Sequence, residues 1–166
     1  LKARTTILRD MGAAMSPFNA FMFIQGLETL ALRMREHSSN AEKVAEYLSN
    51  HESVERVGYP SKMDGYAKER ADKYLTKGNG ALMGFEIKGG VEAGKKFIDA
   101  LEMVYHVANI GDSRSLAIHP ASTTHSQLNE EELLSAGVTP GYVRLSIGLE
   151  HVDDIIADFE QALAKI

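Results

Sequence analysis

The 166-residue chain contains no cysteine and no tryptophan. The absence of cysteine excludes disulfides, thiolate zinc sites and a cysteine nucleophile. Long hydrophobic runs are also missing: the longest apolar cluster, from Phe18 to Leu32, is interrupted by Asn19, Gln25 and Glu28. It therefore falls short of the ~18 consecutive apolar residues that a membrane-spanning helix needs. Positive charge is scarce, with 18 Lys and Arg against 23 Asp and Glu, which argues against nucleic acids and anionic membranes as partners.

Several functional motifs are absent as well. The six histidines include no pair three or four residues apart, so the sequence does not favour a metal site. The glycines of KGNGALMG and IKGGVEAGKK lack the order of a phosphate-binding loop, and no Gly-x-Ser-x-Gly motif occurs. The chain begins with Leu1 and has no signal-peptide pattern. We therefore expect a fragment or a processed product.

What remains is the composition of an ordinary globular protein, 44% hydrophobic and 25% charged. Hydrophobic periodicity and turn residues predict about four mostly antiparallel strands, with helices layered on one face. The predicted strands are Val54–Tyr59, Ala81–Ile87, Val104–Ala108 and Tyr142–Ile147. The predicted helices are Phe18–Glu36, Ala41–Leu48, Asp64–Leu75, Val91–Leu101, Glu130–Ala136 and Val152–Leu163. This pattern indicates an α/β chain of the α+β type.

The first predicted helix is unusual. Ser16 and Pro17 supply a strong helix start. The residues after them are apolar on nearly all sides, so the helix must be covered on more than one face. This favours a missing partner domain or subunit. We expect the polar segment Arg35–Asn40 to kink or interrupt the helix.

Arg144 is the most conspicuous polar residue. It lies in the middle of a predicted strand, on the face shared with Tyr142 and Ser146 and opposite Val143 and Leu145. Two interpretations remain open: an edge-strand arginine paired with a surface carboxylate, or an arginine that binds an anionic ligand through two parallel hydrogen bonds. The long segment Asn109–Leu128, rich in Gly, Ser, Thr, His and Pro, is predicted to be an irregular and functional loop near the same part of the sheet.

Two blocks of sequence resemble the pyridoxal-phosphate (PLP) enzymes of cysteine and methionine metabolism. One is the opening KARTTILRDMGAAMSPFNAFMFIQGLETLALRMREHSSNAEKVAEYL, and the other runs from ANIGDSRSL through IHPASTTHSQL to VRLSIGLE. Within that family the second block is similar to the O-acetylhomoserine sulfhydrylases. The resemblance covers essentially the whole chain, and it implies the small C-terminal domain of a fold-type I PLP enzyme.

The resemblance also implies an activity. In the intact enzyme PLP would act as an electron sink, acetate would leave O-acetylhomoserine, and sulfide or a thiol would add to give homocysteine or methionine. The family holds its Schiff-base lysine and most phosphate-binding groups in a large upstream domain, and no lysine here lies in the Ser-x-Thr-Lys context. We therefore expect the chain itself to bind no PLP and to be inactive. The family also implies a cytoplasmic homo-oligomer, a tetramer when intact, with no nucleic-acid or membrane partner.

By the same resemblance, residues 1–50 form a helical segment that packs on the missing large domain. Residues 51–166 form the domain that binds the substrate carboxylate. Arg144 would hold the α-carboxylate, and Asn109 would assist through its backbone and side chain. Thr124 matches a pocket threonine beside that site, and a structural hydrogen bond within the loop is the alternative of nearly equal weight. Ser115, His119 and His125 are expected to shape the loop.

Two alternatives to the sulfhydrylase remain. The first stays within the family and changes the chemistry, to cystathionine γ-synthase, cystathionine γ-lyase or methionine γ-lyase. The second is a non-catalytic module that binds a small molecule or a partner protein. Asn109 and the DSRSL string favour the sulfhydrylase over the first alternative.

Overall fold

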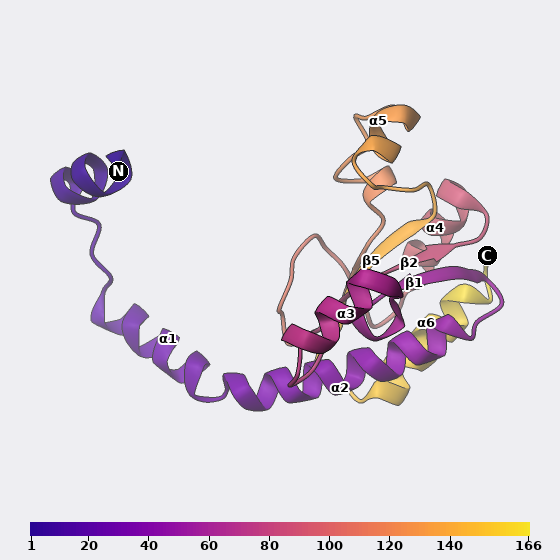
Figure 1. Cartoon of the computed structure of the whole chain (residues 1–166), viewed down its shortest axis with the longest axis horizontal. Coiled ribbons are helices and arrows are strands. Elements are labelled where there is room, and N and C mark those ends of the chain that lie inside the picture. The colour runs from indigo at the N-terminus through magenta and orange to yellow at the C-terminus, as the bar shows by residue number, and fades with distance from the viewer. The chain divides into compact units, whose positions relative to one another are not determined.

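The computed structural model describes the backbone of all 166 residues and every side chain except that of Glu130. Contacts divide the chain into two units, Leu1–Leu32 and Arg33–Ile166. The first unit contains a π-helix, Ala3–Met11, and helix α1, Pro17–Glu28 (Figure 1). Ser16 caps α1 as the sequence predicts, because its Oγ accepts a hydrogen bond from the Asn19 N–H at 3.1 Å.

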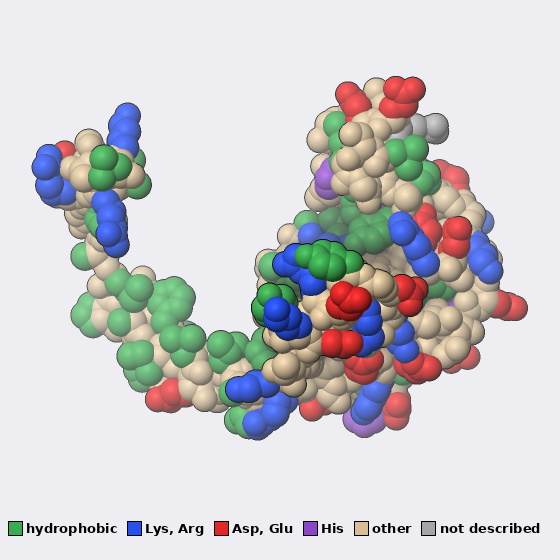
Figure 2. Space-filling view, in the orientation of Figure 1, with side chains coloured by type: hydrophobic (Ala, Val, Ile, Leu, Met, Phe, Trp, Pro, Cys, Tyr) green, Lys and Arg blue, Asp and Glu red, His purple; other side chains and the backbone are tan. Residues whose placement is uncertain are grey.

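Helix α1 exposes apolar side chains on all sides. None of its residues is buried, and Phe18, Phe23 and Leu27 have exposed fractions of 70%, 61% and 64%. Figure 2 shows these hydrophobic side chains gathered along the helix. The prediction of a helix whose apolar side chains the chain itself leaves exposed is therefore confirmed for Pro17–Glu28. Among the described residues, no helix is both long enough and apolar enough to cross a membrane.

Helix α2, Leu30–Ser49, is continuous, so the predicted interruption at residues 35–40 is wrong. The break lies earlier, at Thr29 between α1 and α2. The polar residues that suggested a break are buried and hydrogen-bonded: His37 Nδ1 lies 2.6 Å from the Ile147 carbonyl, and Asn40 Nδ2 donates to the Gly148 carbonyl at 3.2 Å. Burial with hydrogen-bond partners satisfies polar groups inside a helix. Residues 33–49 consequently pack with the second unit, while the predicted division at residue 50 stays a prediction about the intact protein.

The second unit is built on one mostly antiparallel sheet of five strands, which confirms the predicted fold class of about four mostly antiparallel strands with helices and adds one strand. The strands are β1 (Val54–Gly58), β2 (Leu82–Ile87), β3 (Tyr105–His106), β4 (Leu116–Ile118) and β5 (Tyr142–Ser146), in the order β1-β2-β5-β4-β3. Every neighbouring pair is antiparallel except β3 and β4. The unpredicted strand, β4, lies inside the segment that the sequence indicated as irregular. It has only three residues, and its extended form depends on pairing with both β3 and β5.

Four further α-helices complete the unit: α3 (Gly65–Tyr74), α4 (Gly90–Ala100), α5 (Glu130–Ser135) and α6 (Val152–Leu163). Two short 3-10 helices, Pro60–Lys62 and Pro120–Ser122, lie between them and the strands. Helices α2, α4 and α6 contribute to one hydrophobic core with the inner face of the sheet, and α4 packs against α6. Figure 1 shows these helices and the strands of the sheet. The fully buried core residues include Val44, Leu48, Phe97, Val143, Leu145, Ile155 and Phe159. The opposite face of the sheet is therefore free to carry polar side chains.

Phe97 of α4 is the centre of the aromatic part of this core. It is fully buried, and its ring centroid lies 5.4 Å from that of Phe85 and 5.8 Å from that of Phe159. Phe97→Ala should lower the free energy of unfolding by about 3–5 kcal/mol because it leaves a cavity between α4, α6 and the sheet. Chemical denaturation of the chain measures this loss. Tyr66→Ala, at an exposed position of α3, is the control and should change stability by less than about 0.5 kcal/mol.

Candidate functional site

The candidate site lies on the face of the sheet opposite the core. Strand β5 alternates, so that Val143 and Leu145 are fully buried while Arg144 is half-buried on the other face. Arg144 is paired with Gly84 on β2 and with Ile118 on β4. Directly paired residues share a face of a sheet. Gly84 has no side chain, and the ring of Tyr142, on the same face of β5 as Arg144, fills the space over it.

The loop after β3 closes over this face. The Arg144 Nη2 donates to the Asn109 carbonyl at 3.4 Å, and the Gly111 N–H donates to the Ser146 Oγ at 3.1 Å. The structure therefore brings together two of the residues that the sequence singled out, Arg144 and Asn109. Two of the three side chains on this face of β5, Arg144 and Ser146, contact the loop backbone.

Arg144 is not a surface arginine of the kind the first interpretation required. Strand β5 is the middle strand of the sheet, and so it is not an edge. Among the side chains that the structure describes, no carboxylate lies within 4.0 Å of the Arg144 guanidinium. A positive charge in a half-buried position without an acidic partner is an arrangement that favours binding of an anion.

Asn109 lies beside this charge through its backbone carbonyl, and its side chain is exposed. Its backbone N–H donates to the Val107 carbonyl at 3.1 Å, and its Oδ1 accepts from the Ile110 N–H at 2.9 Å. Within the described part of the chain, the Asn109 Nδ2 is the polar group of this residue that has no partner. The Arg144 guanidinium and this amide together offer hydrogen-bond donors of the kind that a carboxylate accepts.

A buried hydrogen-bond network anchors the other end of the same loop. Ser115 is fully buried; its N–H and Oγ–H donate to the two carboxylate oxygens of Glu150 at 2.7 and 2.9 Å. The Ser115 Oγ also accepts from the Gly148 N–H at 2.8 Å. Asn40 of α2 donates to the Glu150 carbonyl at 2.9 Å. Ser115 therefore shapes the loop as expected, whereas no sequence pattern pointed to Glu150, 35 residues away, as its partner.

Thr124 lies apart from the other two candidates. Its side chain is exposed, and its Oγ1 is 2.9 Å from the Nδ1 of His125. In the described residues no hydrogen bond joins Thr124 to Arg144 or to Asn109. The structure therefore shows the hydrogen bond within the loop that the sequence left as an alternative, and a ligand contact of Thr124 stays a prediction.

His119 ties the loop that carries Thr124 to the start of β5. Its side chain is fully buried, with Nε2 2.7 Å from the Pro140 carbonyl and Nδ1 2.8 Å from the Ser122 Oγ. Burial lowers the pKa of the His119 imidazole below its usual value, because the protein interior disfavours the charged ring. A neutral ring fits both contacts: Nε2–H donates to the carbonyl, and Nδ1 accepts from the serine hydroxyl.

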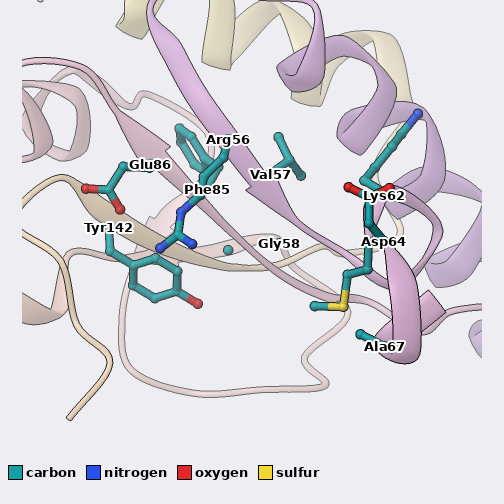
Figure 3. Close-up of a pocket in the computed structure, with 11 residues that line it drawn as sticks. Arg56, Val57, Gly58, Lys62, Asp64, Ala67, Phe85, Glu86 and Tyr142 are labelled. Carbon is teal, nitrogen blue, oxygen red and sulfur yellow. The ribbon is translucent and has the colours of Figure 1, made fainter. Parts of the chain in front are cut away.

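A cavity of about 470 Å³ lies on the same side of the sheet, next to β1, β2 and β5 (Figure 3). The ring of Tyr142 lies over Gly84, in the space that a Cβ of residue 84 would fill. The carboxylate of Glu86 is occupied, because it accepts from the Thr139 hydroxyl and from the Gly141 N–H at 3.0 Å. Sequence reasoning did not predict this cavity. Within the described residues no group of acidic, cysteine or histidine side chains is arranged to hold a metal ion.

Comparison with known proteins gives a consistent result. The sequence profile of the family described as "Cys/Met metabolism PLP-dependent enzyme" matches residues 1–164. The chain is 59% identical over 167 residues to an O-acetyl-L-homoserine sulfhydrylase from Leptospira meyeri and 50% identical over 166 residues to one from Corynebacterium glutamicum. It is also 47% identical over 160 residues to an L-methionine γ-lyase from Fusobacterium nucleatum.

The match covers only part of these relatives. Alignment with the Leptospira and Corynebacterium proteins covers 100% of this chain but 38% of theirs, and with the Fusobacterium lyase 96% of this chain and 40% of the relative. A crystal structure described as an O-acetylhomoserine (thiol)-lyase from Campylobacter jejuni is similar, with a TM-score of 0.87 and 47% identity. That alignment covers 98% of this chain and 39% of the other, and the Campylobacter protein carries N'-pyridoxyl-lysine-5'-monophosphate.

The residues around Arg144 do not themselves fit PLP. The cofactor needs a lysine for its Schiff base, and no lysine occurs in β2, β4, β5 or residues 107–115. The Ser146 hydroxyl next to Arg144 already accepts a hydrogen bond from the Gly111 N–H. The Arg144 guanidinium instead carries the charge and the N–H groups that a small anionic group such as a carboxylate accepts.

The buried neutral ring of His119 predicts a pH dependence of stability. Folding lowers the pKa of the His119 imidazole. At pH values between the lowered pKa and about 6.5, the unfolded chain therefore binds more protons than the folded chain, and protonation shifts the equilibrium toward unfolding. Stability should therefore be highest above pH 6.5 and fall as the pH drops through this window, by at most about 1.4 kcal/mol per pH unit from this group. Chemical denaturation from about pH 7.5 to about pH 5 measures the slope, and His119→Gln should remove this contribution. An unchanged slope in that variant would contradict the assignment.

Proposed function

Because the chain belongs to the Cys/Met metabolism PLP-dependent enzyme family, we propose that it is the C-terminal substrate-binding part of an O-acetylhomoserine sulfhydrylase. The intact enzyme converts O-acetylhomoserine and sulfide, or a thiol, into homocysteine or methionine and acetate. Identities of 59% and 50% to two sulfhydrylases support this member of the family. The observation that carries the proposal is that Arg144 has no carboxylate partner among the described side chains and is held beside Asn109, on the face of the sheet opposite the core.

Arg144 and Asn109 bind the α-carboxylate of the amino-acid substrate. The guanidinium supplies charge and two parallel N–H groups, which fix both the position and the rotation of a carboxylate. The Asn109 amide Nδ2–H adds a third donor from the loop side. Holding one end of the substrate in this way sets the direction of its Cα–H bond and of its side chain, and orientation of this kind contributes to rate as well as to affinity.

The remaining parts of the enzyme lie outside this chain. PLP, its Schiff-base lysine and the phosphate-binding groups belong to the large domain, so the chain alone binds no PLP at a specific lysine. The exposed apolar side chains of α1 pack against that large domain, because contiguous apolar surfaces of this kind usually mark interfaces. The intact protein is a cytoplasmic homo-oligomer, and a tetramer is the assembly we propose for it.

One specific observation favours a second candidate. The Fusobacterium relative at 47% identity is an L-methionine γ-lyase. A γ-lyase would use the same carboxylate contact and would differ in the steps after the γ-substituent departs. The two activities separate by substrate: a sulfhydrylase needs O-acetylhomoserine with an added sulfur nucleophile, whereas a methionine γ-lyase releases a thiol from methionine alone.

A chimeric enzyme tests the proposal with the chain as it stands. The segment of the Leptospira sulfhydrylase that aligns with this chain, 38% of its length, is replaced by residues 1–166. The chimera should form homocysteine from O-acetylhomoserine and sulfide, because at 59% identity the chain should preserve the contacts with the large domain. Homocysteine is quantified by mass spectrometry, and cofactor absorbance confirms assembly.

The chain alone and the truncated Leptospira protein alone are the negative controls and should each be inactive. A chimera that holds PLP but consumes only methionine would contradict the sulfhydrylase activity and support the γ-lyase activity in its place. A chimera that holds PLP and turns over neither substrate would favour the non-catalytic module and contradict the proposal.

Arg144 should dominate the affinity of the same chimera for its amino-acid substrate. Arg144→Lys keeps the charge but loses the two parallel hydrogen bonds, and Arg144→Ala loses both. Loss of a charged hydrogen bond of this kind costs on the order of 2–4 kcal/mol, so kcat/KM for O-acetylhomoserine should fall by a factor of roughly 30 to 1,000. Steady-state kinetics measures the fall.

The control for this prediction is Arg56, which lies on the same side of the sheet in the 470 Å³ cavity. Arg56→Ala should leave kcat/KM near the wild-type value, and PLP content should be normal in every variant. Near-normal turnover of both Arg144 variants would exclude Arg144 as the carboxylate-binding residue, because loss of a charged hydrogen bond to the substrate must lower kcat/KM.

A further inference from the structure

We propose that His119 is a positioning residue for the substrate site, since it fixes the loop that carries Thr124 against the strand that carries Arg144. His119 does not touch the substrate in this proposal. It acts through the residues that it joins. The inference rests on the proposed function, because it assigns to His119 a part in binding the amino-acid substrate of that same site.

His119 occupies the junction of two segments that are distant in sequence. Its Nε2–H donates to the carbonyl of Pro140, 21 residues away, at 2.7 Å. Pro140 lies in the turn before β5, where the Tyr142 N–H donates to the Thr139 carbonyl at 3.1 Å. Only three residues separate Pro140 from Arg144 along the chain. A shift at Pro140 would therefore displace the start of the strand that aims the guanidinium.

The same residue organises the loop on its other side. Its Nδ1 accepts from the Ser122 hydroxyl at 2.8 Å, and its carbonyl accepts from the Thr123 hydroxyl at 2.8 Å. These two hydroxyls immediately precede Thr124, and the Pro120 carbonyl accepts from the His125 N–H at 2.9 Å. All of these contacts lie within residues 119–125. The hydrogen bond from the His119 ring to the Pro140 carbonyl, by contrast, connects this loop to the turn before β5.

Helix α4 holds the ring in place from a third direction. A Cβ on Gly94 would lie 2.5 Å from two ring atoms of His119, so only glycine at position 94 lets the imidazole approach the helix this closely. The ring is fully buried between the helix, the turn and the loop. With no room to turn and with both nitrogens engaged, it has one orientation, which is what a positioning element requires.

The strand pairing links this junction directly to Arg144. Ile118, the residue before His119, is the β4 partner of Arg144 in the sheet. The backbone at His119 therefore leaves the sheet next to Arg144. The His119 side chain bonds to Pro140, just before the strand that carries Arg144. A core histidine that only filled space would be replaceable by an apolar residue of similar size, whereas this one uses both a donor and an acceptor.

The test uses the chimera with O-acetylhomoserine as the varied substrate. His119→Ala should raise KM about 10-fold or more, because two buried hydrogen bonds are lost and the loop and the turn separate. The value of kcat and the PLP absorbance should change less than about threefold. His119→Gln, which can donate to Pro140 through its amide, should recover a large part of the KM. Failure of His119→Gln to recover any of it would count against the Pro140 contact.

Gly94→Ala provides a second, independent variant that leaves the imidazole chemically intact. It should raise KM as His119→Ala does, because the added methyl group displaces the ring. In the double variant the ring is absent, so Gly94→Ala should add less than about a twofold effect. Effects that multiply in the double variant would overturn the proposal.

Asp158→Asn is the control for loss of stability alone. Asp158 is buried, and its carboxylate accepts from the backbone N–H groups of Glu102, Met103 and Val104, far from residues 119–144 in sequence. Its replacement should lower the unfolding temperature while KM stays within about twofold of wild type. A rise in KM equal to that of His119→Ala would mean that destabilisation alone explains the effect, and the proposal would fail.

Hydrogen exchange on the chain itself separates failure of this inference from failure of the proposed function, because it needs no enzymatic activity. His119→Ala should accelerate exchange of the Ser122, Thr123 and His125 amides at least about 10-fold. The Val143 and Leu145 amides, inside the β2–β5 pairing, should stay protected. Unchanged exchange at the three loop amides would overturn the positioning role even if the chimera proved active.

Discussion

The alternation along β5 is the constraint on which the rest of the structure depends. Val143, Leu145 and Ile147 must enter the dry core between the sheet and helices α2, α4 and α6. A register slip of one residue would put the Arg144 guanidinium in that core, where an unpaired charge is very unfavourable. The hydrophobic effect therefore fixes the direction of Arg144 without any contact to it. The polar face of the sheet is a consequence of how the apolar face packs.

Buried polar side chains, rather than apolar packing, set the positions of the irregular segments. Ser115 and Glu150 hold one end of the loop after β3, His119 holds the segment after β4, and Asp158 accepts three N–H groups between α4 and β3. Each of these side chains bonds to backbone atoms or to another polar side chain. Because an unpaired buried polar group costs more than a paired one stabilises, such networks specify one loop arrangement.

The chain carries two incomplete surfaces with different chemistry. One is the apolar surface of α1, in the unit Leu1–Leu32, and the other is the face around Arg144, in the unit Arg33–Ile166, which we propose binds an anion. A two-domain enzyme would explain both surfaces, since the large domain would cover the apolar helix and hold the cofactor. On this proposal the present chain recognises the unreactive end of the substrate, and the chemistry belongs elsewhere.

Periodicity alone determined the helices α3, α4 and α6 to within a few residues, and it placed Arg144 on the polar face of a strand. These features depend on interactions between residues close in sequence and on which face is apolar. Tertiary structure decided the rest. Strand β4 exists because β3 and β5 pair with it, α2 is unbroken because His37 and Asn40 bond to residues more than 100 positions away, and Glu150 meets Ser115 across 35 residues. Such long-range pairings leave no periodic trace in a single sequence, since their energy depends on a contact that only the folded chain creates.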